Sequence, residues 1–232
     1  MKKIKSIRYF AVMAIIFIVL SGVGGCSSAP KTEDSSDKKA EDIYYFILTP
    51  KSGETVSDED IESDIETLRS RLDENGYTEA TITRQDNGLR VEIPAIDNPD
   101  EVMELIGDQG ELQFRDSKGN VKVRGEHVKD ARSGYDENGD PTVYLEFTSE
   151  GATLFASATK AIAAKEDGVE NKLSIYLGDR LISSPTISQE ISNGQATLTG
   201  IDSIDDAKTI ASIIRTPLKT DFLIVEQGEC KI

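Results

Sequence analysis

The sequence is poor in the residues from which metal and redox sites are usually built. Its 232 residues include one histidine, two cysteines and no tryptophan. A structural zinc site usually takes four Cys or His ligands, so this composition leaves little from which to build one. Long apolar runs are also scarce, with one near the start and none of comparable length after it. The composition is typical of a globular protein and argues against a membrane protein with many spans.

Positive charge is scarce and unevenly placed. The chain has 26 Lys and Arg residues against 42 Asp and Glu residues, and all four basic residues before Cys26 lie in an acid-free leader. From Cys26 onward, 22 basic residues face 42 acidic ones, a net charge of −20. Such a surface repels phosphate groups, so we expect no nucleic-acid binding. Cationic partners remain compatible with it.

The leader has the pattern of a signal peptide over residues 1–25. Basic residues precede an apolar run of twelve residues, Tyr9 to Leu20, which is shorter than the roughly 20 residues that a membrane span needs. The following Val23-Gly24-Gly25-Cys26 resembles a bacterial lipobox, which implies cleavage between Gly25 and Cys26 and lipidation of Cys26. Two acyl chains would hold the protein stably on the extracytoplasmic face of the cell membrane. The alternative is an ordinary secretory signal with an incidental cysteine.

The second cysteine, Cys230, lies three residues from the end in a polar stretch. If Cys26 carries lipid, Cys230 has no disulfide partner in the chain. No cation or base stands near it in the sequence, so we expect an incidental thiol rather than a nucleophile.

Residues 26–42 follow as a tether, because this stretch contains no large apolar residue and cannot bury enough surface to fold. The remaining residues, 43–232, predict an α+β fold of two ferredoxin-like units. Residues 43–117 show the order β-α-β-β-α-β, with Glu111 to Phe114 as the closing strand. In residues 118–232 a similar order recurs. It includes a strand from Leu181 to Ser188 and ends with a strand from Phe222 to Val225. Four caps open the expected helices: Ser57, Asn98, Thr148 and Ser203.

Candidates for chemistry each have a simpler explanation. The loop Asp136-Glu137-Asn138-Gly139-Asp140 alternates oxygen ligands, but its glycine position and Phe147 do not fit an EF-hand, so a polar turn is the alternative to weak calcium binding. His127 lies near acids but has no nucleophile elbow to serve, and we expect a surface or helix-start histidine. We therefore predict no catalytic residue, no metal site and no cofactor.

Acidic runs offer the remaining route to catalysis. Asp58-Glu59-Asp60 and the group Asp202, Asp205 and Asp206 could supply paired carboxylates to an extracytoplasmic hydrolase. Their position in first helical turns already has a cause, since acids there interact favourably with the helix dipole. A cleft with two converging acids of strongly raised pKa would be needed to support the hydrolase.

The order of elements and several strings together resemble the large extracytoplasmic domain of the SecD family of the bacterial Sec preprotein translocase. The matching stretches cover residues 65–72 and 76–82, 89–94 with 106–107 and 111–115, 173–187, and 197–200 with 206–207 and 210–215. The resemblance spans about residues 43–227. It implies a base and a head subdomain, for which we expect residues 43–117 and 118–232, and a role in engaging preproteins that emerge from the SecYEG channel.

The family differs from this sequence in its membrane spans. SecD proteins carry transmembrane helices around this domain with the acidic residues of a proton pathway, whereas this sequence has no apolar span after the leader. We expect that the chain does not itself couple proton flow to export. The first hypothesis is therefore a non-enzymatic lipoprotein that binds preproteins, through exposed sheet edges for example, or Sec translocase components. The second is a stand-alone binding or assembly lipoprotein with the same fold and no role in export.

Overall fold

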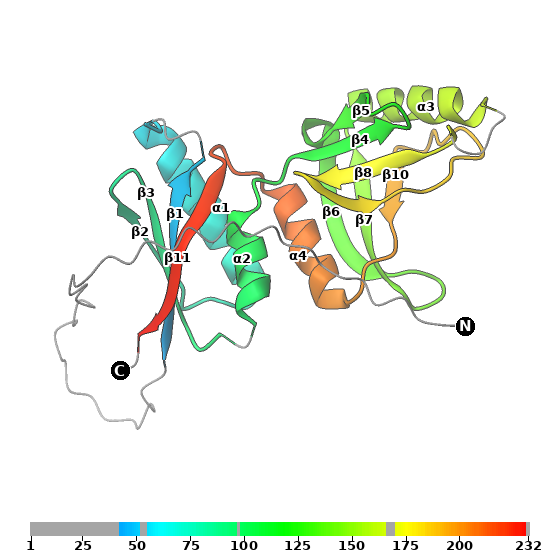
Figure 1. Cartoon of the computed structure of the whole chain (residues 1–232). Helices are drawn as coiled ribbons and strands as arrows, with labels where there is room; N and C mark the ends of the chain where they lie inside the picture. The colour runs from blue at the N-terminus through cyan, green and yellow to red at the C-terminus, as the bar shows by residue number, and fades with distance from the viewer. Residues whose placement is uncertain (1–41, 52–54, 97, 166–169, 231–232) are drawn as a thin grey trace. The chain divides into compact units, whose positions relative to one another are not determined.

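The computed structural model describes residues 42–51, 55–96, 98–165 and 170–230 (Figure 1). The predicted signal peptide, the cleavage site at Gly25 and Cys26, and all but the last residue of the tether lie outside the described residues. They stay predictions.

The first sheet, sheet A, has four strands in the order β11-β1-β3-β2, and every neighbouring pair is antiparallel. These strands are β1 (Ile43–Pro50), β2 (Thr81–Gln85), β3 (Gly88–Pro94) and β11 (Phe222–Cys230). Alternate residues such as Phe46, Leu48 and Val91 are buried on one face of the sheet. With its two helices, this is the strand order of a ferredoxin-like unit.

Four α-helices begin at the predicted caps. The hydroxyl of Ser57 accepts the Asp60 N–H at 3.1 Å, and Asn98, Thr148 and Ser203 cap their helices in the same way. Each cap satisfies one of the backbone donors that a helix start leaves unpaired. The helices are α1 (Asp58–Glu74), α2 (Pro99–Gly107), α3 (Ser149–Ala163) and α4 (Ile204–Arg215).

The prediction that Glu111 to Phe114 closes the first sheet is wrong. The strand there, β4 (Leu112–Asp116), pairs with β8 (Leu173–Leu177) in another sheet, and β11 pairs with β1 in its place. The outgoing chain, just after α2, and the returning chain, just before β11, lie side by side, and the Leu218 N–H donates to the Gln109 carbonyl at 2.8 Å. The segment that returns, rather than β4, therefore completes sheet A. Sheet A is therefore built from two segments far apart in sequence, and the predicted division at residues 117 and 118 stays a prediction about subdomains.

The remaining strands form two sheets rather than the single sheet expected for a second ferredoxin-like unit. Sheet B has the order β5-β4-β8-β9, with β5 (Val121–Arg124) and β9 (Arg180–Ser183) at its edges. Sheet C has the order β10-β7-β6. Its strands are β6 (Val128–Tyr135), β7 (Pro141–Phe147) and β10 (Gln195–Leu198). The α+β class is confirmed, while the second unit differs in its strand pairing.

A cluster of aromatic rings fills the space where sheets B and C meet α3. The ring of Phe114 on β4 packs edge-on against Phe147 and Phe155, with centroids 5.6 Å away in both cases. Phe147 and Phe155 are 4.7 Å apart between centroids. Such packing adds to the burial of the rings themselves, so this cluster anchors α3 to both sheets.

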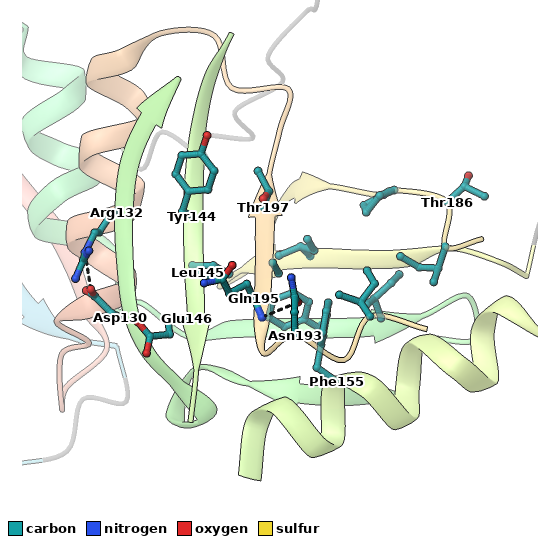
Figure 2. Close-up of a pocket in the computed structure, with 17 residues that line it drawn as sticks. Asp130, Arg132, Tyr144, Leu145, Glu146, Phe155, Thr186, Asn193, Gln195 and Thr197 are labelled. Carbon is teal, nitrogen blue, oxygen red and sulfur yellow. Dashed lines mark hydrogen bonds and ion pairs between the residues drawn. The ribbon is translucent and has the colours of Figure 1, made fainter. Parts of the chain in front are cut away.

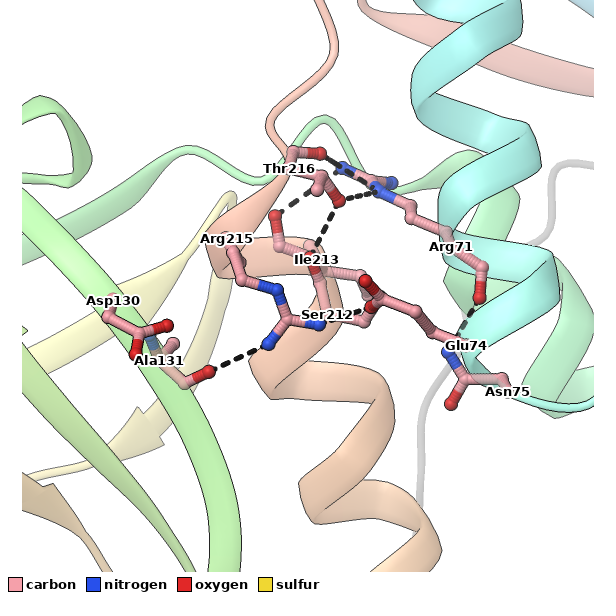
Figure 3. Close-up of polar contacts among 9 residues, drawn as sticks. All are labelled: Arg71, Glu74, Asn75, Asp130, Ala131, Ser212, Ile213, Arg215 and Thr216. Atoms are coloured by element: carbon pink, nitrogen blue, oxygen red, sulfur yellow. Dashed lines mark hydrogen bonds and ion pairs between the residues drawn. The ribbon is translucent and has the colours of Figure 1, made fainter.

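Arginines tie α4 to the helices of sheet A (Figure 3). Arg71 on α1 is fully buried and donates to the carbonyls of Leu105 and Asp108 at 2.9 and 2.6 Å, and to the Thr216 carbonyl at 2.5 Å. One guanidinium thereby satisfies carbonyls at the C-terminal ends of both α2 and α4, which have no partner within their own helices. Arg215 at the end of α4 contacts the Glu74 carboxylate and the Ala131 carbonyl.

Across the described residues, no helix has the length and apolarity that a membrane span requires.

Candidate functional site

A cavity of about 600 Å³ opens between sheets B and C. Figure 2 shows its lining: side chains from β7 and β10, from α3, and from the segment that leads from β9 to β10. The volume falls within the range of about 300–1,000 Å³ that is usual for ligand sites. We call this cavity the groove.

The floor of the groove is apolar. It is formed by strand side chains that point into the space between the sheets, by one ring from α3 and by one residue of the segment between β9 and β10. Most of these side chains also belong to the protein core. These residues are Phe114, Leu145, Phe155, Leu173, Ile175 and Ile187, each at most 6% exposed. An apolar floor of this kind favours apolar side chains of a ligand, whose burial removes their surface from water.

The rim of the groove is polar and lies on one face of sheet C. In the strand register Asp130 stands opposite Glu146, and Tyr144 lies between Arg132 and Thr197. Asp130 pairs with Arg132 at 2.7 Å, and Glu146 pairs with Lys129 at 2.5 Å. Each rim carboxylate thus has its own cation, and the rim does not present a concentrated charge of one sign.

One wall of the groove is a non-strand segment that is held by hydrogen bonds to its neighbours. The Ile187 N–H donates to the Asn171 carbonyl at 2.7 Å, and the Ile191 N–H donates to the buried Thr159 hydroxyl at 3.0 Å. The expected strand from Leu181 to Ser188 therefore ends early, at Ser183. After that residue the chain turns to line the groove with Pro185, Thr186 and Ile187.

The opposite wall is β10, the edge strand of sheet C. Within the part of the chain that the structure describes, β10 pairs only with β7, through four residue pairs from Gln195↔Glu146 to Leu198↔Val143. Side chains of Gln195, Ala196 and Thr197 line the groove. An edge strand beside an apolar cavity combines two means of holding an extended chain, main-chain hydrogen bonds and side-chain pockets.

The residues singled out in the sequence as candidates for chemistry lie away from the groove. The Asp136 loop is the turn between β6 and β7, where the Asp136 carboxylate accepts the N–H groups of Asn138 and Asp140 at 2.8 and 2.9 Å. The bond from Asp140 is the largest cause that lowers the pKa of Asp136. The carboxylate is engaged by its own turn, as expected for the polar-turn alternative, and among the described residues no cluster of three metal-ligating side chains occurs.

His127 ends a short 3₁₀ turn (Gly125–His127), and its Nδ1 accepts the Arg124 N–H at 3.3 Å. Its carbonyl accepts the Thr148 N–H at 2.9 Å, next to the start of α3. These contacts give His127 a local structural role at a helix start. Cys230, the last residue of β11, stands opposite Ile43 in the strand register.

The acidic runs occupy first helical turns as predicted, except Asp202, which precedes the cap residue Ser203 and lies outside the helix. Asp58, Glu59 and Asp60 open α1, and Asp205 and Asp206 open α4. Burial is the main cause that raises the pKa of Glu101, with a further contribution from Asp205 and Asp206. These acids lie outside the groove, so the structure does not place the acid pair required for the hydrolase at the cavity.

The groove itself was not predicted. The sequence predicts no strand at β6, and it predicts a strand as far as Ser188 where the chain in fact forms the groove wall. Strand β6 is mostly polar, and in Lys129-Asp130-Ala131-Arg132 only Ala131 is apolar. It therefore lacks a clear alternation of polar and apolar residues that would predict a strand. Sequence spacing also cannot show that sheets B and C stand face to face.

The comparisons with known proteins place this domain. The pattern of the SecDF P1 head subdomain matches residues 101–218, about half of the chain, and that of the N-terminal part of the P1 domain of the protein translocase subunit SecDF matches residues 61–119. The chain belongs to the SecD/SecDF family. The groove lies within the matched head subdomain.

Individual SecD relatives match a similar part of this chain. The protein translocase subunit SecD of Dictyoglomus turgidum is 32% identical over 164 residues, which are 70% of this chain and 40% of that protein. The SecD of Acidaminococcus fermentans is 31% identical over 179 residues, 75% of this chain and 41% of that protein. This chain therefore spans about two fifths of the SecD proteins that it matches.

Solved structures show the same fold. A crystal structure of SecDF in a super-membrane-facing form matches with a TM-score of 0.66 and 25% identity, over 81% of this chain and 30% of that one. A second SecDF structure, of a membrane component that enhances protein export, matches with a TM-score of 0.60 over 78% of this chain and 98% of that one, at 24% identity.

Proposed function

We propose that this chain is a lipid-anchored, extracytoplasmic SecD-family protein that binds polypeptides in export, either preproteins or components of the Sec translocase. The observation that carries the proposal is the groove, which lies in the matched head subdomain and combines an apolar floor with a free sheet edge. The SecDF relative described as enhancing protein export supports the link to translocation.

An extended polypeptide is the class of partner that fits this groove best. Its main chain offers hydrogen-bond partners for the unpaired backbone groups of the edge strand, and its apolar side chains fit the floor of the groove. In a folded protein, the free backbone groups and the apolar side chains are already buried in its own structure. The net charge of −20 from Cys26 onward further favours clients that are basic or unfolded.

The proposal includes an anchor at Cys26, a non-catalytic role and no proton-motive coupling by the chain itself. Support for the anchor is the lipobox-like Val23-Gly24-Gly25-Cys26 after an apolar run. The non-catalytic role is supported by the groove, where the two rim acids are each neutralised by a cation instead of standing as an acid–base pair. The absence of proton coupling remains an expectation.

The test is recovery of partners from membranes. Full-length protein with an affinity tag at its C-terminus is captured after chemical crosslinking of intact cells, and the partners are identified by mass spectrometry. We expect enrichment of secreted chains or Sec translocase subunits. Enrichment of a stable partner outside export, together with normal secretion in a deletion strain, would instead select the stand-alone binding lipoprotein.

A further inference from the structure

The outer edge of β10 carries backbone groups that have no partner. The Phe147 N–H donates to the Gly194 carbonyl at 2.9 Å. Together with the antiparallel register, this bond shows which residues of β10 point their N–H and C=O groups toward β7. Because the N–H and C=O of successive residues point to opposite sides of a strand, Ala196 and Leu198 face β7 while Gln195 and Thr197 face away.

These outward groups are only partly satisfied. The Gln195 N–H donates to the side chain of Asn193 at 3.1 Å, a contact visible in Figure 2. Within the described part of the chain, the Gln195 carbonyl and both the N–H and the carbonyl of Thr197 have no hydrogen-bond partner. An edge with free groups of this kind is a template for another strand.

We infer that clients bind by adding a strand to the free edge of β10, with the Thr197 backbone as the central hydrogen-bonding residue. This inference rests on the proposed function and specifies how the same groove works. The strand would lie where the cavity is, between β10 and the wall formed by Pro185, Thr186 and Ile187.

The geometry of an added strand defines the class of client. Side chains of an extended strand alternate between the two faces of the sheet that it joins. On one face they meet Ala196, a small residue, and beyond it the apolar floor of the groove. On the other face they meet the polar rim of Tyr144, Glu146 and Gln195. The client is therefore an unfolded segment in which apolar and polar residues alternate.

Two variants at one position test this inference in the full-length protein. Thr197→Pro removes the outward N–H without touching a β7–β10 hydrogen bond, and proline is tolerated in edge strands on their solvent side. Thr197→Val keeps the N–H and the approximate shape of the side chain, so it separates the loss of the N–H from a change of the side chain. Lys118→Ala, at an exposed position in the β4–β5 turn away from the groove, is the control. The probe is a fluorescently labelled nine-residue peptide of alternating leucine and serine with a lysine at each end, and binding is followed by fluorescence anisotropy.

We expect Thr197→Pro to weaken peptide binding about tenfold or more, because one hydrogen bond is lost and the ring obstructs the edge. Thr197→Val should weaken it less, because it keeps the N–H, and Lys118→Ala should bind as the wild type does. Equal affinity of the two variants and the wild type would overturn the inference. The urea midpoint of each variant shows whether it is folded.

Methylated peptides give a second test that does not depend on a variant. Two analogues of the probe carry N-methyl groups on all leucines or on all serines. In an added strand only one set of N–H groups faces β10, so one analogue should lose binding to the wild-type protein and the other should retain it. Equal binding of both would overturn strand addition.

The outcomes separate this inference from the proposed function. If the peptide binds but neither Thr197→Pro nor methylation matters, strand addition fails and the groove's role in binding stands. If the unmodified peptide does not bind, both fail. If the protein alone forms a dimer in sedimentation and Thr197→Pro makes it monomeric, the occupant of the edge is a second copy of the chain and the inference about clients is overturned.

Discussion

Arg71 shows how much of this fold depends on a single charged residue. Its guanidinium is fully buried and donates hydrogen bonds to the backbone carbonyls of Leu105, Asp108 and Thr216. Burial lowers the pKa of Arg71 to about 10, so the side chain is still charged at neutral pH. A buried charge is tolerated here because most of the bonds that it makes satisfy carbonyls at helix ends that would otherwise lack a partner.

Replacing this side chain tests its role. Arg71→Met keeps an apolar stem of similar length but leaves two or three buried carbonyls unsatisfied, each at a cost of about 1–3 kcal/mol. We expect the free energy of unfolding in urea to fall by about 3 kcal/mol or more. Arg69→Met, at an exposed position on the same helix, is the control and should change it by less than about 0.5 kcal/mol. Similar effects of the two substitutions would show that the buried contacts contribute little.

Asp116 makes the stability of sheet B depend on pH. Burial, the largest single cause, would raise the pKa of Asp116, but it is outweighed by hydrogen bonds from Asn120, Lys122 and Lys118, which hold the pKa well below its usual range. A folded-state pKa below the unfolded value of 3.8 gives stability that is present above that pH and is lost as the pH falls below it.

The corresponding experiment compares wild type with Asp116→Asn in urea at several pH values between 7 and 3. We expect the wild type to be more stable at neutral pH, since the amide cannot replace the ion pair with Lys122 at 2.9 Å. The difference should shrink as the pH falls through 4, where the carboxylate of the unfolded chain begins to take up protons. A difference that is constant over this range would contradict the account.

At the scale of elements, the helix starts could be predicted from the sequence and the sheet partners could not. Ser57, Asn98, Thr148 and Ser203 cap the helices that they were expected to cap, because a capping bond is made within three residues. The closing strand of sheet A depends instead on a contact between Gln109 and Leu218. No local pattern reports such a contact.

The groove was missed for the same reason. Its floor residues, Phe114 and Ile175 for example, have the alternation of ordinary buried strands, and nothing in the sequence shows that a cavity lies between them. The family resemblance indicates the domain, whereas the groove depends on how the strands of sheets B and C lie in space. The exposed backbone of Thr197 has no sequence signal at all, since every residue other than proline carries the same groups.

The start of α3 gives a prediction in which propensity and packing disagree. Gly151 lies in the first turn of α3, where alanine would be preferred by about 1 kcal/mol on helix propensity. A Cβ at this position would lie 2.4 Å from the His127 carbonyl oxygen, which is closer than atoms can approach. We therefore expect Gly151→Ala to destabilise the protein, by about 1–3 kcal/mol.

The control for this helix is Ser157→Ala, at an exposed position of α3, which should be neutral or slightly stabilising. Thermal unfolding followed by circular dichroism measures both variants. A Gly151→Ala protein that is as stable as the wild type would mean that α3 does not rest on the His127 turn as described.

At the scale of the whole molecule, the proposed function joins a lipid anchor at Cys26 to a binding domain. The anchor makes a direct prediction: Cys26→Ser should move the protein from the membrane fraction to the soluble fraction, since no thiol remains to carry the acyl chains. Fractionation followed by immunoblotting measures this, and Cys230→Ser is the matched control that should stay on the membrane. Membrane retention of Cys26→Ser would rule out lipidation as the anchor.

Charge also acts at this scale. The chain from Cys26 onward has a net charge of −20, whereas the rim of the groove is locally balanced by the pairs Asp130–Arg132 and Glu146–Lys129. In the proposed function, long-range attraction of basic clients and their short-range fit in the groove are thus separate properties. Salt should weaken the first much more than the second, because charges farther apart than about 8 Å are largely screened at physiological ionic strength.

The central claim, that the groove holds polypeptides during export, is tested most directly by photocrosslinking in living cells. A photoreactive amino acid replaces Thr186, an exposed residue of the groove wall, or Lys118, an exposed residue in the β4–β5 turn away from the groove. The account predicts crosslinks to secreted chains or Sec translocase subunits from position 186 and none from position 118. Equal crosslinking from both positions, or none from position 186, would contradict it.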